Sequence, residues 1–464
     1  MTNVMKLKTL LYITGLTIIL SCNKETTKFD KGEADFSYYV AVGNSMSAGY
    51  CNFALYRSGQ LNSFPSMIAK QLDFVGRKGD FLQPMMSDDS GLGFDIDGDI
   101  APRSHLVMEK DCREDEIIIP RPITAKYSYV TDLNKILSYF APIAQGGPYN
   151  NLGVPGARSY HMNDKNYGRI QSVVDIALGN ATIDEGNPFY ARFCSDPGNA
   201  TILDDAMKIN PTFFTLEIGS NDVLDFAVNG VESADNKITP FDKWNNAMRV
   251  CASRLTSKGA KGIITTVPDV TSIAFFKRYF WNNLPIYDQA RVNSLSAKYP
   301  GMNFHVGKDN AFVIVDSKGV TRQIKSNELV LMDLPMDKVK CEGWGAEAPL
   351  IDRYTLDEYE MQKVFVATEQ YNNAIRQIAE EYNLAIADLN FYMNKYKNGG
   401  WVDGLYISGN YITGKVFSID GIHLTPLGYG IVANVFIDAI NAKFHSSIPR
   451  INPTLYLGEA FPNE

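Results

Sequence analysis

One serine stands where an α/β protein could carry out chemistry. Residues 36–42 alternate apolar side chains as a buried strand does, and the chain then breaks at Gly43, presents Ser45 and turns away by Gly49. In parallel sheets, ligand crevices lie at the carboxyl ends of the strands, and the N–H groups of a following helix favour developing negative charge there. We therefore predict that Ser45 is a nucleophile.

A serine hydroxyl is a weak nucleophile, so it needs a base and preset hydrogen-bond donors. Residues 151–156, NLGVPG, form a glycine turn after a short predicted strand. Asn221 lies in the segment GSND, directly after another predicted strand. Asp420 and His423 form a short acid–base pair, DGIH, just before a predicted helix. Taken singly, these segments are also typical of ordinary turns and helix starts.

Taken together and in this order, the four segments resemble the conserved blocks of the SGNH (GDSL) hydrolase family. The blocks are residues 43–45, 151–156, 219–222 and 420–423. The resemblance runs from about residue 36 to residue 444. Its two long insertions look like those of long lipoprotein members from Bacteroidetes.

The resemblance implies a role for each matching residue. Ser45 would attack an ester carbonyl, and His423 would act as general base and then as general acid. Asp420 would orient the imidazole and stabilise its charged form. The backbone N–H groups of Ser45 and Gly156 and the side-chain amide of Asn221 would form the oxyanion hole. The resemblance implies neither a metal nor an organic cofactor.

The sequence departs from the family pattern at Asn44, where the family usually has Asp. Asn keeps the shape and the acceptor but loses the charge, so the departure bears on site geometry and pH dependence. Leu424 stands where many members have Pro, which affects only loop rigidity. The other histidines lack a matching partner, and we expect His161, which follows the glycine turn, at the surface rather than at the pocket.

The elements that must position these residues alternate along the chain. Predicted strands at 211–218, 260–267 and 384–389 alternate with helical patterns such as 241–257 and 354–382, which favours a parallel sheet covered by helices on both faces. With the resemblance, this predicts an α/β fold: a three-layer sandwich with a flavodoxin-like central parallel sheet, plus two insertions.

The two insertions are expected at about residues 77–147 and 271–350 within a hydrolase domain of residues 36–446. The first is rich in Gly, Pro and Asp and is predicted to be surface loops. The second contains a hairpin pattern at 311–324. Residues 447–464 are expected to form a C-terminal tail.

The composition and charge of the chain are those of a globular protein without a nucleic-acid partner. The 464 residues are 45% hydrophobic and 21% charged, which is ordinary globular composition, and a net charge of −8 without a basic run argues against a nucleic-acid partner. Residues 1–22 have a positive start, an apolar run too short to span a bilayer comfortably, and an end, ILSC, that resembles a bacterial lipobox. We expect cleavage before Cys22, lipidation of Cys22, and a polar tether over residues 23–35, in place of a plain signal peptide or uncleaved anchor.

The remaining cysteines have no zinc-ligand spacing. In an exported protein Cys51 could pair with Cys112, but the spacing alone does not establish any pairing, and buried free thiols are the simpler interpretation. The spacing of Asp95, Asp97 and Asp99 is similar to that of a calcium-binding loop. However, the glycine is at the fourth position of the segment and not the sixth, and no glutamate is at the twelfth. We therefore expect a solvated acidic loop and no metal site.

These observations predict an exported serine esterase or lipase in the bacterial cell envelope, lipid-anchored, periplasmic or facing the cell exterior. Its substrates would be acyl or acetyl esters of lipids or glycans, and the sequence does not choose between them. The alternative is a non-catalytic glycan- or lipid-binding lipoprotein on the same scaffold. Asn44 is its only support.

Overall fold

The computed structural model describes residues 29–96, 100–123, 138–143, 147–169, 185–232 and 237–457. The predicted signal segment with Cys22 lies outside the described residues, as do Asp97 and Asp99. The sequence also predicts a helix over about residues 169–178, which lies outside them except for its first residue.

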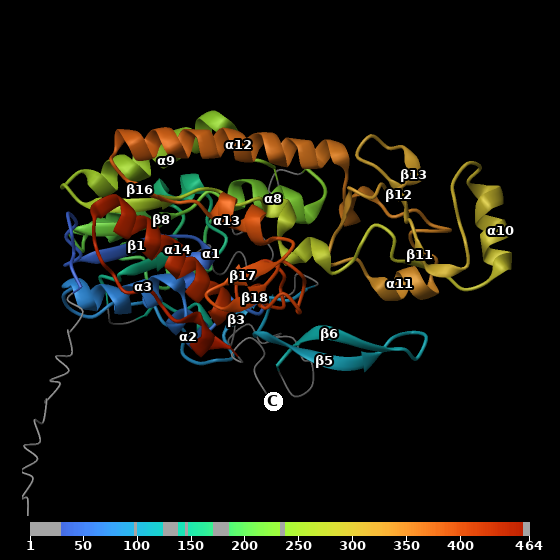
Figure 1. The fold of residues 1–464 in the computed structure, drawn as a ribbon, viewed down its shortest axis with the longest axis horizontal. Coiled ribbons are helices and arrows are strands. Elements are labelled where there is room, and N and C mark those ends of the chain that lie inside the picture. The colour runs from blue at the N-terminus through green and yellow to red at the C-terminus, as the bar shows by residue number, and fades with distance from the viewer. Residues whose placement is uncertain are drawn as a thin grey trace, which may run out of the picture.

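A parallel sheet of five strands forms the centre of the described structure, in the order β16-β9-β8-β1-β7 (Figure 1). The strands are β1 (Tyr39–Gly43), β7 (Asn151–Gly153), β8 (Phe213–Glu217), β9 (Lys261–Thr265) and β16 (Ala385–Ala387). Every neighbouring pair is parallel. In chain order this is 2-1-3-4-5, the flavodoxin-like order, which confirms the predicted fold class.

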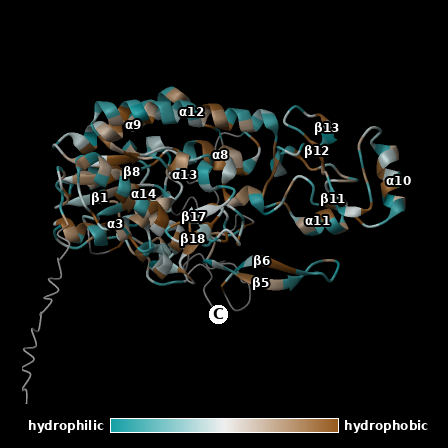
Figure 2. Ribbon diagram, viewed as in Figure 1, coloured by the Kyte–Doolittle hydropathy of each residue, from teal (hydrophilic) through white to brown (hydrophobic). Residues whose placement is uncertain are grey.

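Helices cover both faces of this sheet, with α9 and α12 on one face and α3 and α14 on the other (Figure 1). Their bounds are α3 (Phe64–Leu72), α9 (Phe241–Thr256), α12 (Glu358–Glu381) and α14 (Pro426–Phe444). Figure 2 shows hydrophobic colour on the inner strand β8 and much hydrophilic colour on the outward side of α12. Apolar side chains at helical spacing thus bury against a sheet whose strands are buried and mostly apolar, as is usual for parallel sheets.

Shorter helices lie around the sheet. They are α1 (Ser45–Ala48), α2 (Arg57–Leu61), α6 (Pro188–Ala191), α7 (Ile202–Met207), α8 (Asn221–Asn229) and α13 (Leu389–Tyr396). A hairpin of β17 (Gly400–Val402) and β18 (Leu405–Ile407) follows α13. Among the described residues, no helix has both the length and the apolar character that crossing a bilayer needs.

The first insertion contains strands that the sequence did not predict. Its strands β3 (Leu92–Phe94) and β4 (Ile100–Ala101) form a small sheet with β2 (Ala54–Leu55), which precedes the insertion. An antiparallel hairpin, β5 (Ser104–Lys110) with β6 (Glu116–Pro122), projects from the body (Figure 1). The expectation of surface loops alone is therefore wrong for this part. Exposed Met108 and Ile118 hid the pattern, because their side chains do not alternate with a buried face.

The second insertion forms a lobe beside the sheet with a hydrophobic cluster of its own, which includes Leu295, Phe312 and Leu350 (Figure 1). The predicted hairpin is present as β12 and β13. The elements of the lobe are β10 (Leu284–Ile286), α10 (Gln289–Lys298), β11 (Gly307–Asn310), β12 (Val313–Val315), β13 (Thr321–Gln323), β14 (Leu329–Val330), α11 (Met336–Cys341) and β15 (Thr355–Leu356).

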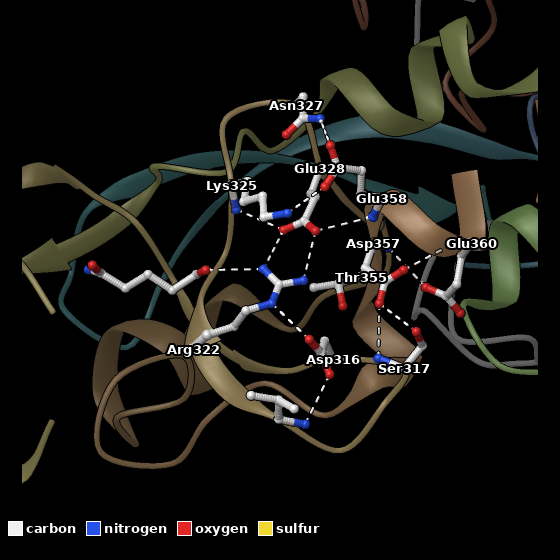
Figure 3. A network of polar contacts seen from close by, with 12 residues as sticks. Asp316, Ser317, Arg322, Lys325, Asn327, Glu328, Thr355, Asp357, Glu358 and Glu360 are labelled. Carbon is white, nitrogen blue, oxygen red and sulfur yellow. Dashed lines mark hydrogen bonds and ion pairs between the residues drawn. The ribbon is translucent and has the colours of Figure 1, made fainter. Parts of the chain in front are cut away.

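A polar network joins this lobe to the start of α12 (Figure 3). Arg322 binds Asp316 at 2.8 Å and forms a two-pronged pair with Glu328, at 2.7 Å for each prong. Ser317 N donates to Asp357, the N-cap of α12, at 3.0 Å. The network therefore holds the hairpin of the lobe against the core helix.

A disulfide joins the two insertions. Cys112, at the tip of the β5–β6 hairpin, is bonded to Cys341 at the end of α11, 229 residues later. Cys51, which we considered as a partner for Cys112, is a buried free thiol, as is Cys251. Cys51 follows α1 in the core, remote from the projecting tip, so that pairing does not form.

Candidate active site

Ser45 is held at the carboxyl end of strand β1, which lies between β8 and β7. The turn is tight because Gly43 has no side chain: a Cβ there would lie 2.1 Å from Ser47 Oγ and 2.4 Å from the Glu217 carbonyl oxygen. The side chain of Asn44 caps α1 by accepting the N–H of Met46 at 2.9 Å. Ser45 is thus the first residue of a short helix whose N-terminus faces the crevice.

His423 reaches Ser45 from the other end of the chain. His423 Nε2 lies 2.8 Å from Ser45 Oγ, and His423 Nδ1 lies 3.1 Å from Asp420 Oδ2. The segment that carries them precedes α14, whose N-cap Thr425 accepts the N–H of Gly428 at 3.1 Å. The structure therefore brings the serine, the histidine and the aspartate into one hydrogen-bonded chain.

Asp420 is fixed from several sides. Its Oδ1 accepts the N–H groups of Ile422 at 2.9 Å and His423 at 2.8 Å, and its Oδ2 accepts the N–H of Phe53 at 3.1 Å. Burial acts to raise the pKa of Asp420, but the charge of His423 and these hydrogen bonds outweigh it and hold the pKa below its usual value. The carboxylate is therefore kept ionised next to the imidazole.

Gly156 and Asn221 line the same hollow as Ser45 and His423. Gly156 has φ +79°, a conformation that favours glycine and turns the peptide of this loop. Asn221, the first residue of α8, donates one amide hydrogen to the Ala157 carbonyl at 3.0 Å, and a side-chain amide has a second to give. The two predicted donor positions and the serine thus face one space.

Asp222 anchors the glycine-turn segment to α8. Its buried carboxylate accepts the N–H of Ser159 at 2.9 Å and the Ser159 hydroxyl at 2.8 Å. The loop that presents Gly156 is thereby tied to the helix that presents Asn221.

His161, expected at the surface, is fully buried: it accepts the Arg158 N–H at 3.1 Å and stacks on Tyr167. That expectation is wrong because the chain folds inward after the turn.

Two further groups at the site were not predicted. The ring of Tyr50 lies 4.5 Å from that of His423, and its hydroxyl donates to the Phe53 carbonyl at 2.6 Å. Glu217, at the end of β8, is buried and accepts the Ser47 hydroxyl at 3.0 Å. Burial raises the pKa of Glu217 to about 8, despite hydrogen bonds from Ser47 and Asn44. The available signal in the sequence was that Glu217 is the one charged residue of the predicted strand segment PTFFTLEI.

A possible cation site lies elsewhere. The carboxylates of Asp352, Asp357 and Glu360 come within 4.8 Å of one another. However, Asp357 and Glu360 already cap α12, because each accepts the other's backbone N–H at 2.9 Å. Burial raises the pKa of Asp352 to about 6 and that of Glu360 to about 8. Protonation therefore reduces the electrostatic repulsion among the three carboxyl groups.

Comparisons with known proteins agree with this geometry at the level of the family. The family model of the GDSL-like lipases/acylhydrolases matches residues 128–436. That range holds Gly156, Asn221, Asp420 and His423, whereas Ser45 precedes it.

Two other comparisons add little. A solved structure of an acetyl xylan esterase, AlAXEase, is 15% identical with a TM-score of 0.24, over 61% of this chain and 92% of that protein, and a likeness so weak carries no argument. No curated protein sequence matches the chain. The family match covers about two thirds of the 464 residues, and the chain therefore belongs to the GDSL-like lipase/acylhydrolase family and is a hydrolase of ester bonds.

Proposed function

We propose that this protein hydrolyses carboxylic esters through an acyl intermediate on Ser45. The observation that carries the proposal is the contact of 2.8 Å between His423 Nε2 and Ser45 Oγ, with Asp420 on the opposite ring nitrogen. This is the arrangement in which an imidazole takes the proton of an attacking hydroxyl.

The proposed reaction has two stages. Ser45 Oγ bonds to the ester carbonyl carbon while its proton passes to His423, and the carbonyl oxygen becomes an oxyanion facing the N–H groups of Ser45 and Gly156 and the amide of Asn221. The intermediate collapses as the alcohol leaves with the proton from His423. Water then attacks the acyl-Ser45 in the same way and releases the acid.

A serine-directed fluorophosphonate tests the nucleophile. We expect the wild-type protein to be labelled and Ser45→Ala not to be. Ser66→Ala is the matched control, because Ser66 is a buried serine on α3 outside the site, and it should stay labelled. Failure of the folded wild-type protein to react would instead favour the non-catalytic binding protein on this scaffold.

We also propose that the protein is exported and anchored in the bacterial cell envelope by a lipid on Cys22, with acyl or acetyl esters of lipids or glycans as substrates. The lipobox-like ILSC and the Cys112–Cys341 disulfide support export, since disulfides persist in oxidising compartments. Metabolic labelling with a clickable fatty acid in a bacterial host tests the anchor: the wild type should carry label in the membrane fraction, and Cys22→Ala should not.

A further inference from the structure

Two hollows of different character meet at Ser45. We call them the inner pocket, of about 110 Å³, and the outer cleft, of about 440 Å³. Both are lined by Ser45, Asn221, Leu224, Ile422 and His423. An ester whose carbonyl carbon lies at Ser45 Oγ therefore has one space available for its acyl part and another for its alcohol part.

The inner pocket is apolar. It is enclosed by α13, by the end of the β17–β18 hairpin and by α14, and these elements contribute Leu389, Met393, Ile407, Ile431, Val432 and Val435 to its wall. Lys397 also lines it, but its ammonium group binds Asn394 at 3.0 Å and lies 3.8 Å from Asp269. A hydroxyl-rich group placed here would lose its hydration without finding enough partners, which costs free energy.

The outer cleft is larger and carries charge. Asp95, Asp225, Asp333 and Arg353 line it beside Gly156. Arg353 is paired with Asp333, and Asp225 is paired with Arg158 at 2.9 Å. Hydroxyl groups can exchange hydrogen bonds with such groups, so this cleft suits the polar part of an ester.

We propose that the inner pocket holds the acyl chain of the substrate, that this chain has about eight to twelve carbons, and that a polar alcohol occupies the outer cleft. The length follows from the walls: the lining residues run from Leu389 to Tyr396 on α13 and from Gly428 to Val435 on α14. At about 1.5 Å per residue each wall extends over about 10 Å, roughly the length of an extended acyl chain of this size. The inference rests on the proposed function and chooses a medium-chain acyl ester over an acetyl ester.

A series of p-nitrophenyl esters from acetate to palmitate tests the chain length. Burying one methylene group is worth about 0.8 kcal/mol of transfer free energy, so each added methylene can raise kcat/KM by at most roughly fourfold. We expect kcat/KM to peak between octanoate and dodecanoate, about a hundredfold or more above acetate, and to fall at palmitate. A best rate with acetate, or a flat profile, would overturn the inference.

Filling the inner pocket tests its location. We expect Val432→Trp on α14 and Met393→Trp on α13 each to lower the decanoate-to-acetate ratio of kcat/KM about tenfold or more. Because the two residues lie on different helices, one variant that fails to fold leaves the other as a test. Val366→Trp is the control, since Val366 is exposed on α12, and it should keep the wild-type ratio. An unchanged ratio in a folded pocket variant would contradict the assignment.

The outcomes separate this inference from the function on which it depends. Hydrolysis of acetate with fluorophosphonate labelling of Ser45, but without any preference for chain length, would leave the esterase and overturn the acyl pocket. Absence of both labelling and hydrolysis with every ester would overturn the two together.

Discussion

At the scale of single residues, Glu217 is the group that most constrains the site. Its carboxyl is buried behind the turn that presents Ser45 and is bound to Ser47, two residues after the serine. Asn44 lies against it as well, because the N–H of Asn44 donates to the Glu217 carbonyl oxygen at 3.2 Å and the Asn44 amide donates to Ser220 Oγ at 2.9 Å. An aspartate at position 44 would place a second carboxyl next to Glu217, which gives a physical reason for the departure from the family pattern.

The first prediction concerns Glu217→Gln and pH. Burial raises the pKa of Glu217 from 4.5 to about 8 in the folded protein, so the native state keeps a proton that the unfolded chain loses. The stability contribution is present below about pH 4.5 and is lost as the pH rises to 8, by roughly 4–5 kcal/mol. Chemical denaturation should therefore show that the free energy of unfolding of Glu217→Gln rises relative to that of the wild type between pH 4.5 and 8.

The control is Glu369→Gln, because Glu369 is exposed on α12. Its free energy of unfolding should depend on pH as that of the wild type does. If the Glu217→Gln variant also showed the wild-type pH dependence, Glu217 would have the same pKa in the folded and the unfolded state, which would contradict the prediction.

The second prediction is a double-mutant cycle between positions 44 and 217. Asn44→Asp should destabilise the protein by about 1–3 kcal/mol at pH 8, because two carboxyl groups then share a buried site. In the Glu217→Gln background the same change should cost much less. Denaturant midpoints of the four proteins measure the coupling, and additivity within about 0.5 kcal/mol would contradict it.

At the scale of elements, the parts nearest to strand ends could be predicted and the parts that depend on distant packing could not. Ser45, Asn221 and His423 each follow a local pattern, a strand end or a helix start, so their positions follow from residues beside them. The β5–β6 hairpin has no such pattern, since its outer faces expose Met108 and Ile118. The inward turn of His161 depends on packing against Tyr167, which no local spacing reveals.

The third prediction concerns the joint between the second insertion and α12 (Figure 3). The side chain of Glu328 is completely buried, and Arg322 supplies its charge partner. Arg322→Met should cost about 3 kcal/mol or more, because it leaves a buried carboxylate unpaired. Lys325→Met is the matched control: Lys325 pairs with Glu358, but both side chains are more than half exposed.

Thermal unfolding and trypsin cleavage after Lys318, a site that both variants keep, measure the effect. Arg322→Met should melt lower and be cut faster, and the control should resemble the wild type. Equal behaviour of the two variants would show that the buried pair does not hold the lobe.

At the scale of the whole molecule, the two insertions are joined to each other and both line the outer cleft. The hairpin tip is joined to the lobe by the Cys112–Cys341 disulfide, by an ion pair of Asp111 with Lys340, and by Arg113 lying 3.8 Å over the ring of Tyr287. Sequence could not reveal this pairing, because the two cysteines are 229 residues apart and meet only when both insertions have folded.

The fourth prediction is that this crosslink stabilises the fold and the alcohol side of the site. Closing a loop of 229 residues removes unfolded-state entropy worth about 5 kcal/mol. Cys112→Ser combined with Cys341→Ser should therefore lower Tm, and reductant should lower the wild-type Tm toward that value while leaving the Tm of the double variant unchanged.

The crosslink should also affect the outer cleft, because Phe94 and Met332, from the two insertions, both line it. KM for esters of bulky alcohols should thus rise more than KM for p-nitrophenyl octanoate, and an equal rise for both would contradict a role of the crosslink in shaping the cleft.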